Sequence, residues 1–416
     1  MPEARPPAGK AISRNIFAFG ATSFLNDTAS EMAYWVLPAF LASLGAGPAQ
    51  LGIIEGIAES VASFAKLFSG YLADRVRRRK PIVVAGYVVA NAVKPLLALT
   101  TSWGQILVIR FADRFSKGIR GTARDVMVAE SQVKSRLGFA YGLIQAMDSA
   151  GAIAGPLIAL VLLPHYGLRA IFWAAAIPGL LCIVVAMLGI RETQAAYASR
   201  TQSKSFSSDS RLDVPLPEPE VMNSTTGHAS RLPRSFYFVL LAVTLFSLGN
   251  SSDMFLVLRA QSIGISAVRA PVLGLVFNIT YTLFSWPAGH LSDRLSRRAM
   301  AAAGYLVFAA VYLVFGIAPS TPAIWFAMAV YGLFYALTNP VLKALVAETV
   351  SSEVRGRALG VYFFVTSVAA LLASVITGQL WKQYGARVPF LLSAGIAAVS
   401  AVLLLASRRA QVVATS

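Results

Sequence analysis

Long apolar runs separated by short polar connections dominate the hydrophobic pattern of this chain. A helix that spans a membrane needs about 20 mostly apolar residues, and about twelve runs meet that need. They lie at 13–43, 51–73, 81–101, 104–128, 138–163, 168–190, 235–258, 271–291, 299–318, 322–346, 356–381 and 387–407. The pattern therefore predicts an all-α membrane protein with twelve transmembrane helices.

One long polar segment interrupts this pattern between the sixth and seventh runs. Residues 192–233 are rich in Ser, Thr, Pro and charged residues. Such a composition cannot bury a core, so we expect a mobile cytoplasmic linker. The linker divides the chain into an N-terminal six-helix bundle at 13–191 and a C-terminal six-helix bundle at 234–408. Short tails at 1–12 and 409–416 flank the two bundles.

The cations gather in alternate connections between the runs. The stretch "GYLADRVRRRKPIVV" (70–84) puts five basic residues between the second and third runs, whereas "GAGPAQ" and "TTSWGQ" in the connections on either side have no Lys or Arg. Loops rich in Lys and Arg stay in the cytoplasm. We therefore expect a multi-pass protein of the cell (inner, cytoplasmic) membrane, with both termini cytoplasmic and with basic loops that can touch anionic lipid head groups.

The overall composition argues against the other partners that a basic protein could have. A net charge of +17 and a basic run of this kind are typical of nucleic-acid binding. However, only 13% of the residues are charged and 56% are hydrophobic, and a soluble domain carries about 25% charged residues. We therefore expect no nucleic-acid partner. The single cysteine and the three scattered histidines also predict no metal site and no cofactor.

The two halves of the chain repeat one another. Three pairs of short segments match in the same order: "GYLADRVRRR" (70–79) with "GHLSDRLSRR" (289–298), "MVAES" (127–131) with "LVAET" (345–349), and "LGII" (51–54) with "LGLV" (273–276). Internal duplication of this kind is common in secondary transporters, whose two halves rock around a central site.

The first of these repeats resembles the loop motif of the major facilitator superfamily, Gly-x-x-x-Asp-Arg-x-Gly-Arg-Arg, with Arg77 in place of the second glycine. The resemblance extends over nearly the whole chain and implies two pseudo-symmetric six-helix bundles that alternate access to a central site. It also implies a cytoplasmic gate, in which we expect Arg124 to be a partner of Asp74. The gate residues would be Gly70, Asp74, Arg75, Arg78, Arg79, Arg124, Gly289, Asp293 and Arg294.

Two further segments resemble motifs of the same family. "RFSKGIRG" (114–121) is similar to the fourth-helix motif, with Arg114 and Gly118 at its basic and glycine positions. "GLIQAMDSAGAIAGP" (142–156) is similar to the fifth-helix motif of drug–proton antiporters, although the trailing glycine pair of that motif is missing. Its matching residues are Gly142, Gly151, Gly155 and Pro156.

Ionisable residues inside the apolar runs are costly, so they are the main candidates for function. Asp27 and Glu31 lie four positions apart in the first run and share one helix face. Two carboxylates this close in a low-dielectric cavity do not both ionise easily, which suits a proton carrier. With Asp148 of the fifth run they are the predicted proton-coupling residues. The alternative is that these acids pair with basic residues of neighbouring helices.

The fourth run carries an unusual stripe of cations, Arg110, Arg114, Lys117 and Arg124, and Asp113 lies four positions before Lys117. If acids on neighbouring helices balance these cations, the stripe is structural. If the acids fall short, the cavity is net positive and favours an anionic or zwitterionic substrate. In the second half, we expect Pro340 to break the tenth helix near Lys343. The predicted substrate-cavity residues are Asn26, Arg110, Asp113, Arg114, Lys117, Gln145, Asp253, Asn339 and Lys343.

These features predict a monomeric secondary active transporter that moves a small organic solute, with protons as the coupling ion and efflux as the direction. The alternative keeps the fold, changes the cargo to an organic anion or a siderophore-like metabolite that the basic stripe would bind, and allows import as the direction. No nucleophile motif, phosphate loop or metal cluster favours an enzyme.

Overall fold

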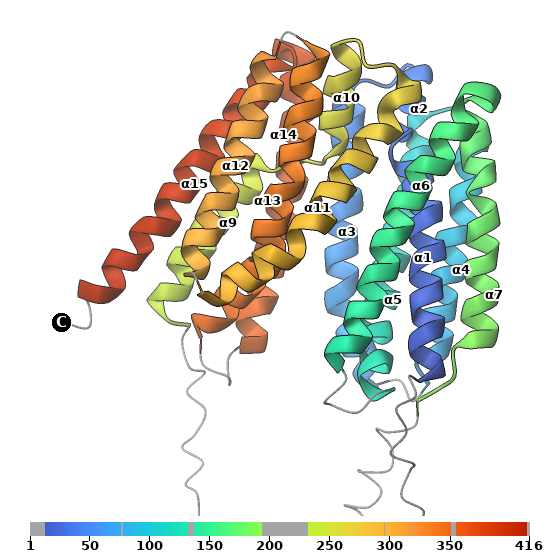
Figure 1. The fold of residues 1–416 in the computed structure, drawn as a ribbon, viewed down its shortest axis with the longest axis horizontal. Helices are drawn as coiled ribbons and strands as arrows, with labels where there is room; N and C mark the ends of the chain where they lie inside the picture. The colour runs from blue at the N-terminus through green and yellow to red at the C-terminus, as the bar shows by residue number, and fades with distance from the viewer. Residues whose placement is uncertain are drawn as a thin grey trace, which may run out of the picture.

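A computed structural model of the chain describes residues 13–75, 78–131, 137–193, 232–294, 296–318, 320–350 and 355–413. Every regular element in these ranges is a helix, and the helices form two groups that lie side by side (Figure 1). The first group runs from α1 to α7 and the second from α9 to α15. The predicted all-α fold is thereby confirmed, and its two groups correspond to the two halves of the chain.

Within the described ranges, the structure has seven α-helices in the first half and seven in the second. In the first half they are α1 (Arg14–Tyr34), α2 (Leu37–Ser43), α3 (Pro48–Arg75), α4 (Lys80–Leu96), α5 (Trp103–Glu130), α6 (Leu137–Ala174) and α7 (Ala176–Gly189). In the second half they are α9 (Arg234–Gly249), α10 (Met254–Ser262), α11 (Ala270–Arg294), α12 (Arg297–Ile317), α13 (Thr321–Glu348), α14 (Arg355–Tyr384) and α15 (Arg387–Val413).

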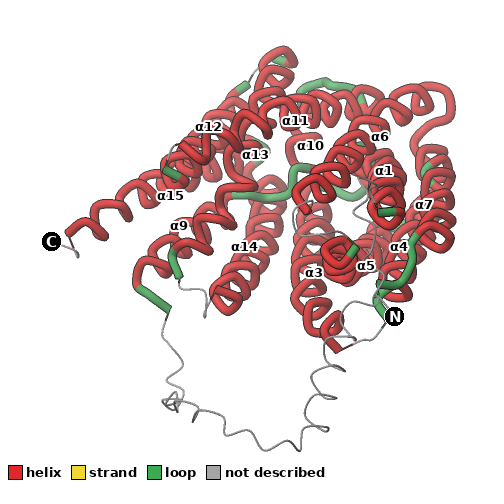
Figure 2. Tube along the Cα trace, turned by 60° about the horizontal axis from the view of Figure 1, so that its bottom comes forward, coloured by secondary structure: helices red, strands yellow, loops and turns green. Residues whose placement is uncertain are grey.

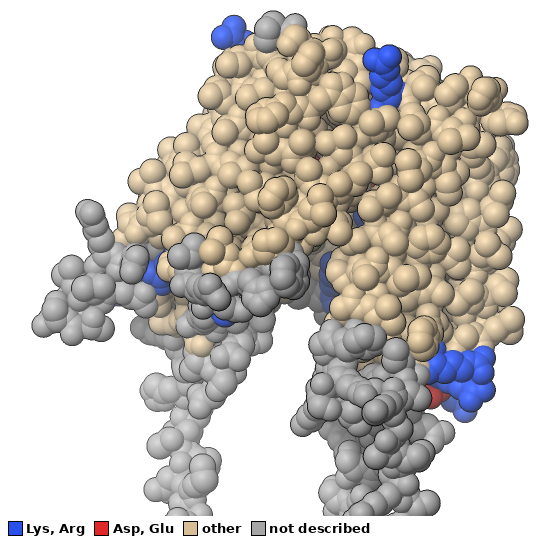
Figure 3. All heavy atoms as spheres, in the orientation of Figure 1, with Lys and Arg blue, Asp and Glu red and all other residues tan. Residues whose placement is uncertain are grey.

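Eight stretches of the described residues are long and apolar enough to cross a membrane. One of them, Ala140–Gly189, bends at Gly167, where φ is 74°, so it runs through two successive helices. Helices α1, α3 and α5 do not meet the same measure, and these three carry most of the buried acids and cations described below. The surface has few charges between the two ends of the molecule: in the view of Figure 3 the flank is nearly free of charge, and Lys and Arg gather toward the two ends.

The internal repeat is visible in the backbone. Gly45 and Gly264 have positive φ in the turns after α2 and α10, and Gly167 and Gly385 have positive φ at the corresponding later turns. Serines precede α5 and α13 with nearly the same backbone angles, φ −140° and ψ 153° for Ser102 and φ −140° and ψ 151° for Ser320. The two halves therefore share local geometry as well as sequence motifs.

The first helix of each half is broken near its end. Trp35 and Val36 separate α1 from α2, and the segment 250–253 separates α9 from α10. The expected break at Pro340 is wrong, because α13 continues through this residue to Glu348. A proline removes one helical hydrogen bond, and neighbouring helices can satisfy the freed carbonyl. The exposed backbone in the second half lies instead before Asp253.

The two halves meet along two helix pairs, α3 with α14 and α6 with α11. A Cβ atom on Gly52 of α3 would lie 2.3 Å from the Ser374 carbonyl oxygen, and one on Gly378 of α14 would lie 2.5 Å from the Pro48 carbonyl oxygen. Small residues let helices approach this closely in a membrane. In Figure 1 the halves converge around α2 and α10 and spread apart at the opposite end, and Figure 2 shows α14 facing α3 where the halves meet.

Candidate functional site

Three neighbouring cavities lie between and beside the two halves. The first, of about 330 Å³, is lined by Tyr34, Glu59 and Ser63 of the first half and by residues of α9, of the segment 250–253, of α13 and of α14. The second, of about 600 Å³, shares Ser63 with the first. The third, of about 50 Å³, shares Tyr34 with the first cavity and shares Asp27 and Lys117 with the second. Figure 3 shows the molecule hollowed between its halves at the end where the helices spread.

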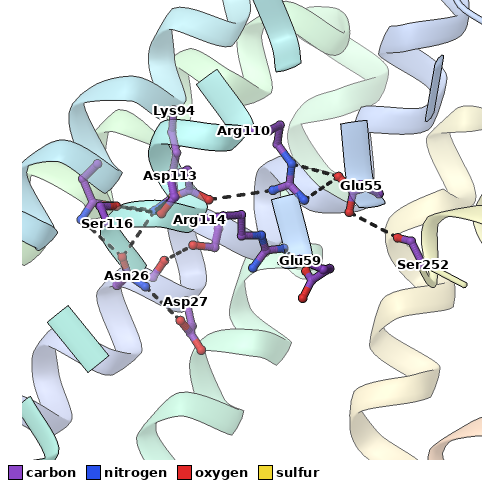
Figure 4. Close-up of polar contacts among 12 residues, drawn as sticks. Asn26, Asp27, Glu55, Glu59, Lys94, Arg110, Asp113, Arg114, Ser116 and Ser252 are labelled. Atoms are coloured by element: carbon purple, nitrogen blue, oxygen red, sulfur yellow. Dashed lines mark hydrogen bonds and ion pairs between the residues drawn. The ribbon is translucent and has the colours of Figure 1, made fainter. Parts of the chain in front are cut away.

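Arg110, the first cation of the α5 stripe, forms an ion pair with Glu55 of α3. The Arg110 guanidinium donates from two nitrogens to one Glu55 oxygen, at 2.7 and 3.0 Å, and the Glu55 side chain is fully buried. The other Glu55 oxygen accepts from the Ser252 hydroxyl at 3.2 Å (Figure 4). Because Ser252 lies in the break between α9 and α10, this ion pair links the two halves of the protein.

The next cation of the stripe pairs one helical turn further along α3. An Arg114 nitrogen lies 3.3 Å from a Glu59 oxygen, and the Glu59 side chain is 48% exposed, toward the first cavity. Arg110 and Arg114 therefore have acidic partners on α3, which favours the structural interpretation of this part of the stripe.

Asp113 does not pair with Lys117 as its spacing suggests. Its two oxygens lie 3.9 Å from Lys94 and 3.9 Å from Arg110. The Lys94 ammonium, buried in α4, donates to the Asn91 side-chain oxygen at 3.0 Å and to the Asn26 oxygen at 3.4 Å. Asn26 in turn donates to Asp27 at 3.0 Å, so a polar network reaches from α5 through α4 to the first helix (Figure 4).

Asp27 of α1 and Asp148 of α6 face each other across the second cavity and lie within interaction range. The glycines of the fifth-helix motif explain how the two helices approach so closely. A Cβ on Gly151 would lie 2.5 Å from the Phe24 carbonyl oxygen and 3.2 Å from the Asp27 Cβ, and one on Gly155 would lie 2.8 Å from the Glu31 Cβ. The motif therefore places α6 directly against the acidic face of α1.

Glu31 connects this acidic face to the second half. Its carboxylate accepts a hydrogen bond of 2.7 Å from the Trp35 indole nitrogen. The Trp35 ring lies against Gly274 of α11, where a Cβ would come within 2.1 Å of the ring. A change at Glu31 can therefore be transmitted to the interface between the two halves.

In the second half, Asp253 lies at the break between α9 and α10 and lines the first cavity. Tyr331 donates to one of its oxygens at 2.6 Å and Tyr335 donates to the other at 2.9 Å. Among the residues that the structure describes, no cation pairs with Asp253. Two further acids, Glu55 and Glu59, lie within range of Asp253.

The cations in the C-terminal part of α5, Lys117, Arg120 and Arg124, line the second cavity. Arg120 stacks on the Tyr87 ring at 4.6 Å, and Arg124 binds the neighbouring Asp125 at 3.1 Å and Ser23 at 3.3 Å. Lys117 lines the second and third cavities, and within the described ranges it forms no ion pair with an acid.

Several predicted residues stay untested or lie apart from this group. The side chains of Gly70, Asp74, Arg75, Gly289, Asp293, Arg294, Asn339 and Lys343 are outside the described part of the structure, so the pairing of Asp74 with Arg124 stays a prediction. Arg78 is exposed, and Arg79 binds Glu130 at 2.6 Å at the end of α5. Gln145 is exposed and lines none of the three cavities, and Gly142 has no close neighbour. Pro156 is buried in α6.

Comparison of the sequence with known protein families gives a match that covers both halves of the chain. The sequence profile of the Major Facilitator Superfamily matches residues 19–258 and 237–415. The chain belongs to this superfamily. It is therefore a membrane transporter and not an enzyme.

Several similar proteins match this chain over more than nine tenths of its length. The uncharacterized MFS-type transporter MJ1317 of Methanocaldococcus jannaschii is 33% identical over 404 residues, which cover 95% of each chain. The multidrug resistance protein MdtG of Escherichia fergusonii is 24% identical over 389 residues, 92% of this chain and 91% of the relative. The inward-facing, unoccupied bacterial homolog of the human lysosomal transporter Spinster has the same fold, with a TM-score of 0.74, 14% identity and coverage of 96% and 98%.

Sequence reasoning did not identify the tyrosine pair on Asp253 or the role of Lys94. Tyr331 and Tyr335 lie four positions apart, so they share a helix face, and this spacing was the available signal. Lys94 looks like a residue that extends to the membrane surface, but it is buried in a polar network. Its position opposite Asn26 and Asp113 depends on how three helices pack together.

Proposed function

We propose that this protein is a proton-coupled exporter of a small organic solute, located in the cytoplasmic membrane with both termini on the cytoplasmic side. The observation that carries the proposal is the acid pair Asp27 and Asp148, which the glycines of the fifth-helix motif bring together at the wall of the second cavity.

Proton coupling would follow from the electrostatic cost of holding two ionised carboxylates, Asp27 and Asp148, at the wall of the second cavity. Two facing carboxylates in a low-dielectric, partly enclosed cavity repel each other, so one of them readily takes up a proton. A proton there changes the attraction between α1 and the cations of α5, and Lys117 and Arg124 lie at the same cavity. Glu31 is a second carrier, because its bond to Trp35 extends to α11.

Alternating access would use the close glycine contacts between α3 and α14 as the surfaces on which the halves rock. The cavity in its present form opens at the end where the helices spread, which the positive-inside rule assigns to the cytoplasm. In this arrangement cargo can enter from the cytoplasm, while the Arg110, Glu55 and Ser252 contacts hold the opposite end closed.

Efflux as the direction is supported by two likenesses, the fifth-helix motif and the sequence similarity to MdtG, a multidrug resistance protein. The organic-anion alternative depended on a free basic stripe. Glu55 and Glu59 neutralise its inner half, so that alternative loses much of its support.

The test is a proton-flux assay in everted membrane vesicles that contain the protein, with an acid-sensitive acridine dye and a panel of cationic, anionic, zwitterionic and neutral fluorescent solutes. A solute that is exchanged for protons should restore the dye fluorescence. Asp27→Asn should abolish this signal while the protein stays in the membrane, and Glu192→Gln, outside the three cavities, should keep it. A normal signal in Asp27→Asn would remove Asp27 from the coupling mechanism.

A further inference from the structure

Two side chains of opposite charge line the neighbouring cavities without an ionic partner in the described parts of the chain. Asp253 belongs to the second half and lines the first cavity, and Lys117 belongs to the first half and lines the second and third. From this arrangement we infer that the cargo is a zwitterion, whose cationic group binds at Asp253 and whose anionic group binds at Lys117. This inference rests on the proposed transport function and specifies its substrate class.

The first cavity is built for a small cationic group with hydrogen-bond donors. Beside Asp253 and Glu59, it is lined by hydroxyl groups from both halves and by the rings of Tyr34 and Tyr335, which can receive a cation on their faces. The lining hydroxyl residues are Ser63, Ser247, Ser251, Ser252, Thr366, Ser367 and Ser374. The buried Asn250 side-chain oxygen in the helix break lines the same cavity and has no hydrogen-bond partner, so it offers a further acceptor.

The cations that could neutralise Asp253 are engaged elsewhere. Arg110 binds Glu55 and Arg114 binds Glu59, and both of these acids lie within range of Asp253. The first cavity therefore carries an excess of negative charge. An ammonium or similar group on the cargo would offset that charge without breaking an existing ion pair.

The second cavity has the opposite balance. Its lining contains four cations, Lys66, Lys117, Arg120 and Arg124, and three acids, Asp27, Asp125 and Asp148. Asp125 is engaged with Arg124, and Asp27 and Asp148 lie at the α1 and α6 wall of the cavity, where the proposed mechanism uses them to carry the proton. Glu31 and Glu59 lie within range of Lys117 but bind Trp35 and Arg114 instead. A carboxylate or phosphate on the cargo is therefore the natural partner of Lys117.

The energetic argument favours one ligand that satisfies both positions. A charged side chain that lines an intramembrane cavity without an ionic partner is stabilised when a group of opposite charge binds beside it. A purely cationic ligand would leave Lys117 unsatisfied, and a purely anionic ligand would leave Asp253 unsatisfied. A zwitterion offsets both costs at once, and because its two ends bind different halves, it also draws the halves together as the cavity closes.

The test measures binding and needs neither a membrane nor a proton gradient. Purified protein in detergent is screened by thermal shift against free amino acids and dipeptides, against their C-terminal amides, which are cationic only, and against their N-acetyl forms, which are anionic only. The wild-type protein should be stabilised by members of the zwitterionic set, with affinities about tenfold or more above those of either matched derivative.

Two variants should shift this preference in opposite directions. In Lys117→Gln the amides should bind as well as or better than the parent zwitterions, and in Asp253→Asn the N-acetyl forms should do so. Lys382→Gln and Glu192→Gln, which lie outside the three cavities, should leave the preference unchanged. Lys117 is an exposed residue, so its variant should fold even if Asp253→Asn does not.

Three results would overturn the inference: no stabilisation by any zwitterion at millimolar concentration, equal binding of all three ligand sets, or an equal loss of all binding in both variants. Failure of the proposed transport function is separate, since it would appear as zwitterion binding without proton exchange in vesicles. Proton exchange driven by purely cationic solutes would instead support the transport function and reject the zwitterion.

Discussion

Arg110 and Glu55 form a buried, two-nitrogen ion pair that extends from α5 through α3 to Ser252 in the second half. Glu55→Gln should therefore lower the stability of the folded protein by about 3–5 kcal/mol, because it leaves the Arg110 charge buried without its partner. The measurement is the melting temperature of the purified protein in detergent, followed by fluorescence on heating.

A double variant separates charge from packing at this pair. Glu55→Leu with Arg110→Leu removes both charges and should recover most of the stability that either single change removes. Arg78→Gln at the exposed end is the control. An unchanged melting temperature in Glu55→Gln would show that the pair carries little of the stability.

The contact between Gly151 and α1 should be intolerant of any larger side chain. Gly151→Val places two methyl groups where the Phe24 carbonyl and Asp27 already lie, so the helices must separate and the acid pair must come apart. We expect proton-coupled transport to be lost although the protein still inserts. Gly142→Val, in the same motif but without close neighbours, should keep most of the activity. Full activity in Gly151→Val would show that the close approach is not required.

Removing either tyrosine hydroxyl that binds Asp253 should change both the stability of the protein and the pH dependence of transport. Tyr331→Phe and Tyr335→Phe each remove one donor from a carboxylate and should each destabilise the protein by about 1–3 kcal/mol. They should also change the pH dependence of transport, because a carboxylate with fewer donors holds its charge less well. Tyr305→Phe is a matched control, since the Tyr305 hydroxyl is buried in the same half without a partner. An identical pH profile in all three variants would argue against a functional Asp253.

The predicted cytoplasmic gate can be tested at Asp74. Asp74→Ala should slow transport without lowering the melting temperature, because a gate contact must form and break in every cycle. Arg79 provides a contrast: its bond of 2.6 Å to Glu130, which also accepts from Thr193, fixes the end of α5. Arg79→Gln should reduce stability and transport together. Wild-type turnover in Asp74→Ala would leave this loop with a role in topology alone.

Sequence reasoning was most successful where one physical rule governs the outcome. Apolar runs of membrane-spanning length predicted the all-helical membrane fold, and the repeated loop motif predicted the relationship between the halves that Gly45 and Gly264 now display. Acids on neighbouring helices were recognised as candidate partners for the basic stripe, because the membrane penalises unpaired charge. The sequence could not assign which acid meets which cation.

The errors have a common cause. Asp113 lies 3.9 Å from Lys94 of α4 and 3.9 Å from Arg110, one turn back on its own helix, rather than pairing with Lys117. An i,i+4 preference is worth only about 0.2–0.5 kcal/mol, so a partner on a packed neighbouring helix outweighs it. Pro340 does not break α13, which runs through it to Glu348. Local rules are weak when a tertiary contact competes with them.

Hydrophobic length was enough to predict a helical membrane protein, because burial in lipid acts on each segment independently. The repeated segments predicted its two related halves, and the resemblance of the loop motif to the major facilitator superfamily implied a transporter. The partners of the charged side chains depend on helices far apart in sequence. Only the packing of α6 on α1 through Gly151 and Gly155 placed Asp148 beside Asp27, and only the break before Asp253 placed this acid in the wall of the first cavity, next to the cavities that Lys117 lines. Electrostatic energy depends on distances in space, and the folded arrangement of the two halves sets those distances.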